Sequence, residues 1–184
     1  MRVISGEFRG RRLAMVPGNG TRPTADKIKE SMFNMIGPYF DGGQALDLYA
    51  GTGGLGIEAV SRGMTHAVLV DSAYAAIKTI RENVKLTKAA DRFTILKQPV
   101  ERAISHFAAE KQQFDLILMD PPYAKQRVLA QLAEFISGDL LAPGATVLVE
   151  TGTDVTYPEN IPGYRIVRHQ SYSVAQVMIL RKED

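Results

Sequence analysis

The sequence has no cysteine and no long hydrophobic run. Without cysteine, the chain has no disulfide framework, thiolate nucleophile, zinc ribbon or iron–sulfur cluster. No stretch approaches the roughly 20 apolar residues of a membrane-spanning helix. Residues 1–6 lack the apolar run of a secretion signal. We therefore expect a cytoplasmic protein without a membrane partner.

Histidine is scarce as well, and the rest of the composition is that of a globular domain. The three histidines are scattered along the sequence, so we expect no metal site. The chain of 184 residues is 45% hydrophobic and 23% charged, which excludes a disordered or low-complexity protein. This length is typical of one domain. We expect that domain to be a monomer.

Charge is unevenly distributed along the chain. The formal net charge is +2, yet the first 30 residues hold seven basic and three acidic side chains. A basic segment on a slightly acidic body is typical of a protein whose terminal segment meets a polyanion. A charged terminus that is merely solvated would have the same composition. We expect a basic extension over residues 1–40 and a folded core over residues 41–184.

Short apolar segments alternate with amphipathic ones through the middle of the chain. Five segments are β-rich and almost continuously hydrophobic, as strands buried on both faces are, and they cover residues 45–49, 67–70, 93–96, 116–119 and 146–149. Helical spacing of apolar residues follows a cap at Ser72, and again precedes a stop at Gly138. The alternation predicts an α/β fold with a doubly wound, mostly parallel sheet.

The two ends of the chain depart from this alternation. Residues 164–169 and 175–180 are β-like, and the linker between them is too short for a helical crossover, which predicts an antiparallel hairpin at one edge of the sheet. Residues 1–16, punctuated by glycines, are consistent with a small β-hairpin. Thr24 is then expected to cap a helix that runs to about Ile36.

A glycine-rich turn lies between the first predicted strand and a helix. Gly51, Gly53 and Gly56 satisfy G-x-G-x-x-G, which lets the backbone approach a ligand closely and offers free N–H groups at the helix start. Asp71 closes the next strand 20 positions after Gly51, a spacing that suits a carboxylate bound to ribose hydroxyls. The motif occurs with nicotinamide dinucleotides and with S-adenosylmethionine, so it leaves both open.

Asp47 distinguishes between these two candidate cofactors. A carboxylate in an apolar strand is costly to bury unless it has a partner. S-adenosylmethionine carries a sulfonium and an amino group that could be this partner, whereas a nicotinamide dinucleotide has no such group there. Alternatively, Asp47 accepts hydrogen bonds from the backbone of the glycine loop. A dehydrogenase is further disfavoured because the chain has no second domain to hold its substrate.

Asp120-Pro121-Pro122-Tyr123 follows the fourth predicted strand, at the same carboxyl edge as the glycine loop. Consecutive prolines fix an extended, rigid turn. The Asp120 carboxylate and the Pro121 carbonyl can accept hydrogen bonds from the two N–H groups of an exocyclic amine and stabilise its developing positive charge. Tyr123 can stack on an extruded base. Alternatively, the segment is a turn that only ends a strand.

With these residues the sequence resembles S-adenosylmethionine-dependent amino-methyltransferases, whose motifs I and IV correspond to the glycine loop and to residues 120–123. Residues 2–13 (RVISGEFRGRRL), 21–24 (TRPT) and 30–34 (ESMFN) are similar to the N-terminal signature of the bacterial 16S rRNA guanine-N2-methyltransferase family. The resemblance covers essentially the whole chain. It implies a seven-stranded, Rossmann-like methyltransferase sheet with a small N-terminal hairpin and helix extension.

The resemblance also implies a reaction and its partners. The cofactor would be S-adenosyl-L-methionine, and the substrate would be a guanine N2 amine in 16S rRNA, on free RNA or on the assembling small ribosomal subunit. The extension over 1–40 would bind RNA, and the core over 41–184 would bind the cofactor and catalyse the reaction. The motif at 120–123 by itself also allows adenine N6 in DNA or RNA, or a protein glutamine, as acceptor. A non-catalytic RNA-binding assembly factor is a further alternative.

Individual residues take roles from the resemblance. The base would be held by Asp120, Pro121, Pro122 and Tyr123. Cofactor contacts would come from Asp47, Tyr49, Ala50, Gly51, Thr52, Gly53, Asp71, Ser72, Gln98 and Asp120. RNA contacts would come from Arg9, Arg11, Arg12, Arg22, Thr24, Lys27 and Asn34. One departure is that Pro99 stands where such enzymes usually place an Asp for the adenine amino group, and either Gln98 or a backbone carbonyl is the expected replacement.

Overall fold

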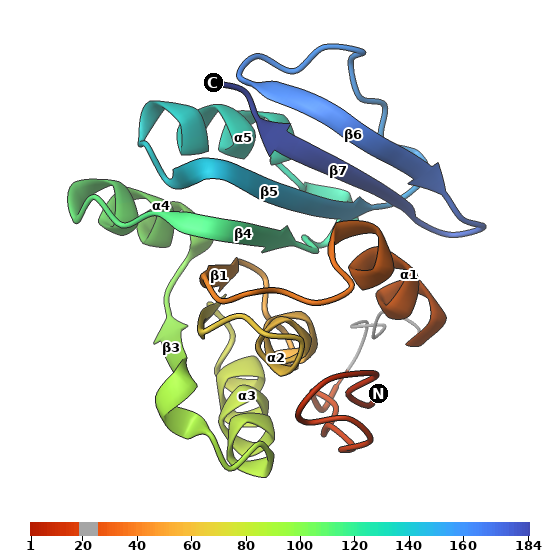
Figure 1. Cartoon of the computed structure of the whole chain (residues 1–184), viewed down its shortest axis with the longest axis vertical. Helices are drawn as coiled ribbons and strands as arrows, with labels where there is room; N and C mark the ends of the chain where they lie inside the picture. The colour runs from red at the N-terminus through yellow and green to blue at the C-terminus, as the bar shows by residue number, and fades with distance from the viewer. Residues whose placement is uncertain (19–25) are drawn as a thin grey trace.

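A seven-stranded sheet forms the centre of the computed structural model, which describes residues 1–18 and 26–184 (Figure 1). The strands are β1 (Gln44–Asp47), β2 (His66–Asp71), β3 (Phe93–Lys97), β4 (Phe114–Met119), β5 (Leu141–Thr151), β6 (Tyr164–Ser171) and β7 (Gln176–Lys182). Their order is β3-β2-β1-β4-β5-β7-β6. The first five are parallel, and β7 is antiparallel to both β5 and β6. The predicted doubly wound sheet with an antiparallel hairpin at one edge is confirmed.

Helices cover both faces of the sheet. They are α1 (Asp26–Ile36), α2 (Gly54–Ser61), α3 (Tyr74–Leu86), α4 (Val100–Ala109) and α5 (Val128–Ser137), with short 3-10 turns at Ala90–Arg92 and Tyr123–Lys125. The apolar sides of α1, α2 and α3 share one core with one face of the sheet, and those of α4 and α5 share a second core with the other face. None of the helices in the described part of the chain is long and apolar enough to cross a membrane.

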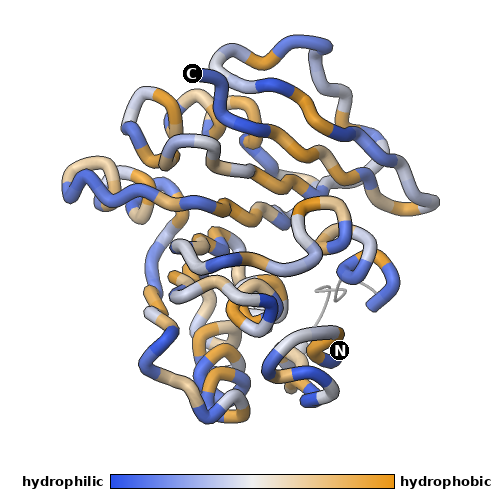
Figure 2. The backbone as a smooth tube through the Cα atoms, viewed as in Figure 1, coloured by the Kyte–Doolittle hydropathy of each residue, from blue (hydrophilic) through white to orange (hydrophobic). Residues whose placement is uncertain are grey.

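The continuous hydrophobicity of the central strands has a direct cause in this layering. Ala45 and Leu69 face the core of α1 to α3, whereas the neighbouring residues Leu46 and Val68 face α4 and α5. Successive side chains of a strand point to opposite faces, and here both faces are covered. Figure 2 shows hydrophobic residues following the strands through the middle of the molecule.

Two local features differ from the sequence-based expectations. α4 is missing from the expected helices, although Val100, Ala103, Ile104 and Phe107 have helical spacing and are buried. α3 begins at Tyr74 with Ala73 as its N-cap residue and without a side-chain cap, so the cap expected at Ser72 is wrong. The cap expected at Thr24 lies outside the described residues.

The N-terminal segment is a short hairpin, as predicted, in which the Val3 N–H donates to the Arg11 carbonyl at 2.9 Å and the Leu13 N–H donates to the Met1 carbonyl at 3.0 Å. A single isolated antiparallel bridge joins Arg2 to Arg12, and a turn lies between them. The segment also bonds to helices: the Phe8 N–H donates to Ser61 Oγ on α2 at 2.9 Å, and the Ala14 N–H donates to Asn83 Oδ1 on α3 at 2.7 Å. The segment is therefore fastened to the layer of α2 and α3, beside the sheet edge where β1 ends (Figure 1).

Candidate active site

The predicted site residues gather where the parallel strands end. The glycine loop follows β1, Asp71 is the last residue of β2, and Asp120 follows β4 directly. Because β1, β2 and β4 are parallel neighbours, their carboxyl ends meet at one edge of the sheet. α1 and the tip of the β6–β7 hairpin border the same edge, and Ser31 Oγ lies 2.7 Å from the hydroxyl of Tyr172 in that tip (Figure 1).

Each glycine of the motif has its own structural reason. Gly51 has a φ of 58°, and a Cβ placed on it would meet no atom within 4 Å, so this side of the loop is open. Gly53 has a φ of 82° and caps α2, which glycine does without strain. A Cβ on Gly56 would lie 2.2 Å from Leu69 Cδ2, so only glycine lets α2 pack this closely on β2. The loop thus has the geometry of a nucleotide-binding turn.

Asp71 holds the open side of this loop in place. Its Oδ2 accepts a hydrogen bond from the Gly51 N–H at 2.9 Å, and its Oδ1 accepts one from the Ala73 N–H at 2.9 Å. Its backbone carbonyl accepts the Gln98 N–H at 3.1 Å, which brings the end of β3 to the same place. Each carboxylate oxygen keeps a further lone pair for a ligand hydroxyl, so the role expected for Asp71 stays a prediction.

Asp47 is fully buried beneath the loop. Its Oδ2 accepts the Gly56 N–H at 3.0 Å, whereas its Oδ1 has no hydrogen-bond partner among the described residues. Burial raises the pKa of this carboxyl to about 7, the Gly56 hydrogen bond opposes the rise, and the charge of Asp71 adds to it. Backbone bonding therefore accounts for one oxygen only. The other is a buried acceptor at a place where a ligand cation would be stabilised.

The raised pKa of Asp47 predicts a specific dependence of stability on pH. In the unfolded chain this carboxyl loses its proton near pH 4, whereas in the folded protein it keeps the proton up to about pH 7. The folded state then binds more protons between these values, so its stability falls as pH rises through that window. We expect Asp47→Asn to raise the melting temperature of the ligand-free protein relative to wild type more at pH 8 than at pH 5.

Thermal unfolding of both proteins across this pH range measures the effect, with Asp139→Asn, an exposed change, as the control. A difference between Asp47→Asn and wild type that stays constant from pH 5 to pH 8 would contradict the prediction.

Asn83 joins the glycine loop to the N-terminal segment and was missed by sequence reasoning. Its fully buried side chain donates from Nδ2 to the Thr52 carbonyl at 2.8 Å and to the Ala14 carbonyl at 3.0 Å, and it accepts the Ala14 N–H at Oδ1. The signal was a polar residue within the apolar face that Ile80 and Val84 define on α3. One amide thus fixes the position of Thr52 in the loop.

We expect Asn83→Leu to weaken binding of S-adenosylhomocysteine by about tenfold, because two buried carbonyls lose their donor at a cost of roughly 1–3 kcal/mol each. Isothermal titration with S-adenosylhomocysteine measures this. Thr79→Val is the matched control, since Thr79 is also buried on α3 but its hydroxyl bonds only within the helix, to the Ala75 carbonyl at 3.0 Å. An unchanged affinity in a less stable Asn83→Leu protein would show that the residue serves stability alone.

The Asp120–Tyr123 segment is fixed against β5. Pro121 is buried, and Pro122 has an extended backbone with φ −55° and ψ 128°. The Tyr123 ring lies over Gly152, where an added Cβ would be 3.3 Å from Tyr123 Cδ2, and its hydroxyl donates to Glu150 Oε1 at 3.4 Å. The ring is still 44% exposed, so one part of it is held and another part faces solvent. This arrangement offers a stacking surface three residues after Asp120 in the sequence.

The other expected cofactor residues differ in burial and in hydrogen bonding. The Tyr49 hydroxyl accepts a hydrogen bond from Gln131 Nε2 on α5 at 2.6 Å, and burial raises the pKa of this phenol. Ala50 is buried and its N–H donates to the Val70 carbonyl. Ser72 is exposed beside Asp71, and Gln98 is half-buried. Pro99, the departure from the family pattern, is the N-cap residue of α4.

The expected RNA contacts lie on the N-terminal segment and α1. Four of them are exposed, namely Arg9, Arg12, Lys27 and Asn34. Arg11 is half-buried with its guanidinium 5.1 Å from the centre of the Phe8 ring, so it also supports the segment. Arg22 and Thr24 lie outside the described residues.

Within residues 1–18 and 26–184, no group of three His, Asp or Glu side chains could hold a metal ion. A metal-free reaction stays a prediction.

Comparison with known proteins gives matches over nearly the whole chain. The model of the family described as conserved hypothetical protein 95 matches residues 1–181. "Putative rRNA methyltransferase YlbH" of Bacillus subtilis is 42% identical over 182 residues, which cover 99% of each chain. "Ribosomal RNA small subunit methyltransferase D" of Haemophilus influenzae is 29% identical and covers 87% of this chain and 84% of its own.

Solved structures agree with this result. The structure titled "Putative methyltransferase yhhF from Escherichia coli" superposes with a TM-score of 0.82 at 29% identity, and the match covers 100% of this chain and 98% of that one. The agreement therefore includes the N-terminal segment as well as the sheet.

Proposed function

The chain belongs to the family described as conserved hypothetical protein 95, and from this premise we propose that it methylates the N2 amine of a guanine in 16S rRNA. The resemblance found in the sequence is thereby confirmed at the level of the family. Relatives that match along most of their length are named as rRNA methyltransferases, so the chain is an S-adenosylmethionine-dependent rRNA methyltransferase. The atom methylated and the 16S molecule are the proposed part. The observation that carries the proposal is the meeting of the glycine loop and Asp120–Tyr123 at one sheet edge.

The loop residues fit the cofactor. The open side of Gly51 leaves room for a ligand against the backbone, and Asp71 holds that backbone in place. Asp47 Oδ1, which has no hydrogen-bond partner within residues 1–18 and 26–184, suits a positively charged group of the ligand. S-adenosylmethionine, when bound, supplies a methyl group on a sulfonium sulfur, and this methyl group is readily transferred.

The chain's own contribution to the chemistry is to orient and activate the amine. An exocyclic base nitrogen is a weak nucleophile because its lone pair is delocalised into the ring. The Asp120 carboxylate and the Pro121 carbonyl would each accept a hydrogen bond from one of its two N–H groups. These bonds would turn the lone pair out of conjugation with the ring. The carboxylate also stabilises the positive charge that grows on the nitrogen during the reaction. Tyr123 would stack on the base and hold it in position.

The RNA would meet the N-terminal side of the molecule. Arg9, Arg12 and Lys27 are exposed there, and such side chains bind backbone phosphates without reading the sequence. We propose residues 1–40 as the RNA-binding extension and residues 41–184 as the catalytic core of a monomer that acts in the cytoplasm. The substrate would be 16S rRNA or the small subunit during its assembly.

The test is to incubate the protein with S-adenosylmethionine and either a 16S rRNA transcript or 30S particles, and to analyse the digested nucleosides by mass spectrometry. N2-methylguanosine is expected. N6-methyladenosine, or methylated glutamine in the ribosomal proteins, would replace the proposal by another acceptor. No methyl incorporation into either substrate would favour an RNA-binding assembly factor.

A further inference from the structure

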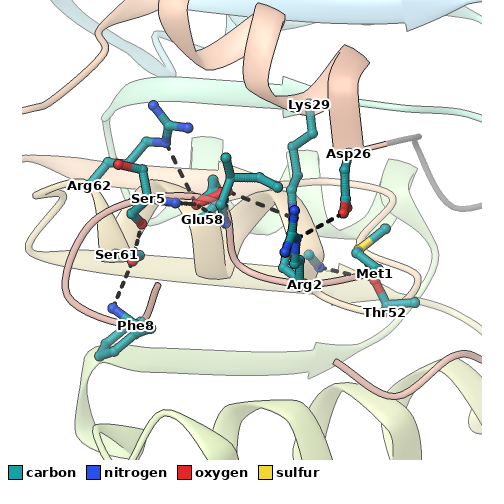
Figure 3. Close-up of polar contacts among 12 residues, drawn as sticks. Met1, Arg2, Ser5, Phe8, Asp26, Lys29, Thr52, Glu58, Ser61 and Arg62 are labelled. Atoms are coloured by element: carbon teal, nitrogen blue, oxygen red, sulfur yellow. Dashed lines mark hydrogen bonds and ion pairs between the residues drawn. The ribbon is translucent and has the colours of Figure 1, made fainter. Parts of the chain in front are cut away.

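A group of three charged side chains is buried between α1, α2 and the N-terminal segment (Figure 3). Lys29 and Glu58 are fully buried, and Arg62 is 3% exposed. Glu58 Oε1 lies 3.8 Å from Lys29 Nζ, and its Oε2 lies 3.6 Å from Arg62 Nε. The closest hydrogen bond to the carboxylate comes from the Ile4 N–H at 2.8 Å. Glu58 therefore holds the N-terminal segment and two cations together.

The group holds more positive than negative charge. Two cations share one carboxylate, and Arg62 cannot lose its proton at any ordinary pH. Lys29 Nζ also donates to the Arg2 carbonyl at 2.6 Å, and burial lowers the pKa of Lys29. Arg62 Nη1 donates to the Pro38 carbonyl at 3.2 Å, whereas its buried Nε has no hydrogen-bond acceptor within the described ranges. The positive charge of Arg62 is thus only partly compensated.

A small pocket of about 290 Å³ opens above Arg62. Arg9 lies at its rim, Asn34 and Glu30 come from α1, and the hydroxyls of Ser5 and Tyr39 lie 2.8 Å apart in its wall. Arg9 is exposed and has no acidic ion-pair partner in the described part of the chain. The residues lining this pocket thus carry two positive charges, on Arg9 and Arg62, against the one negative charge of Glu30.

We propose that this pocket binds a backbone phosphate of the RNA substrate, which rests on the proposed function. Arg62 supplies a positive charge from the floor of the pocket, and Arg9 supplies a second one from the rim. Of the hydroxyls of Ser5 and Tyr39, which share one hydrogen bond, the one that accepts can donate to a phosphate oxygen, and so can the amide of Asn34. The pocket lies at the end of α2 away from the glycine loop, about 12 Å along that eight-residue helix. The bound phosphate would belong to a nucleotide some distance from the methylated base.

Two opposite charge changes test the pocket with 16S rRNA as the probe. Filter binding of the transcript at several KCl concentrations is expected to show about fivefold weaker binding for Arg9→Gln, with a salt slope lower by about one. Glu30→Gln is expected to tighten binding about threefold, because it removes the opposing charge. Arg102→Gln is the control, since Arg102 is exposed on α4, which covers the opposite face of the sheet. Equal behaviour of Arg9→Gln and Arg102→Gln, or weaker binding by Glu30→Gln, would overturn the proposal.

A second measurement does not depend on RNA. The Nε–H resonance of Arg62 in a ¹H–¹⁵N spectrum is expected to shift on titration with inorganic phosphate in wild type, and to stay in place in Asn34→Glu, which puts a carboxylate at the pocket. No shift in wild type would overturn the phosphate site. If wild type shows the shift but methylates no rRNA, the proposed function fails and the phosphate site stands. If wild type methylates rRNA and the shift is absent, the phosphate site fails and the proposed function stands.

Discussion

Replacing Asp120 with Asn is expected to lower kcat by about 10²–10³-fold, a loss typical of removing one preorganised group that stabilises developing charge. The carboxylate is the one negatively charged group of the Asp120–Tyr123 segment, and the amide that replaces it is neutral and keeps only one acceptor oxygen. The affinity for S-adenosylhomocysteine is expected to change by less than about threefold, since Asp120 is one of ten expected cofactor contacts and Asp47 and the glycine loop are untouched. Methyl incorporation into 16S rRNA and calorimetric titration with S-adenosylhomocysteine measure the two quantities.

The matched control for this change lies near the opposite end of β4, the strand that Asp120 follows. Asp115 is exposed near the start of β4, and its Oδ2 accepts the Gln44 N–H at 2.8 Å, at the edge of the sheet away from the active site. Asp115→Asn is expected to keep kcat close to that of wild type. Near-normal turnover by Asp120→Asn would remove the role assigned to the carboxylate and, with it, the proposed way of activating the amine.

Replacing Glu58 with Gln is expected to lower the free energy of unfolding by about 3–5 kcal/mol, the range found when one partner of a buried ion pair is removed. Lys29 and Arg62 would stay buried without a counter-charge, and the side chain of Gln would keep the size of Glu. Urea unfolding at pH 7 measures the change. Adding Lys29→Met to Glu58→Gln is expected to recover part of the loss, because the double variant no longer buries an unpaired ammonium.

An exposed ion pair provides the comparison. Glu101 lies 3.7 Å from Arg127, and both side chains are more than half exposed. Glu101→Gln is expected to cost less than ~1 kcal/mol, as is usual for surface pairs. If Glu58→Gln also costs less than ~1 kcal/mol, the buried group is not what fastens the N-terminal segment to α2.

The sheet could be predicted from the sequence because its strands are buried on both faces. Residues 116–119 are continuously apolar, and each of them lies in one of the two cores. The four-residue link before β7 excluded a helical crossover, which was enough to predict the antiparallel hairpin. The periodicity of α4 is also present in the sequence, since Val100, Ala103, Ile104 and Phe107 have helical spacing. The regions with strong periodicity were thus predictable, and so was the N-terminal hairpin from its glycines, whereas its bonds to α2 and α3 were not.

The positions of the site residues were predictable to the extent that strand ends determine them. Asp71 and Asp120 come together because parallel neighbours of β1 end at one edge. Lys29 shows the limit of such reasoning, since it counts among the basic residues of the first 30 but is fully buried against Glu58. Composition records a charge but not the direction in which its side chain points. Asn83 is similar, because its three bonds depend on the approach of segments that are distant in sequence.

The two hydrogen bonds of Asp71 to Gly51 and Ala73 have a consequence for how a nucleoside would bind. The loop is held in its ligand-ready shape by the protein's own carboxylate, so the conformational entropy of those residues is already lost when the chain folds. Binding then loses little further freedom in the loop, and more of the contact energy is retained as affinity. Preorganisation of this kind would let a loop with several glycines bind a small nucleoside without first having to become ordered.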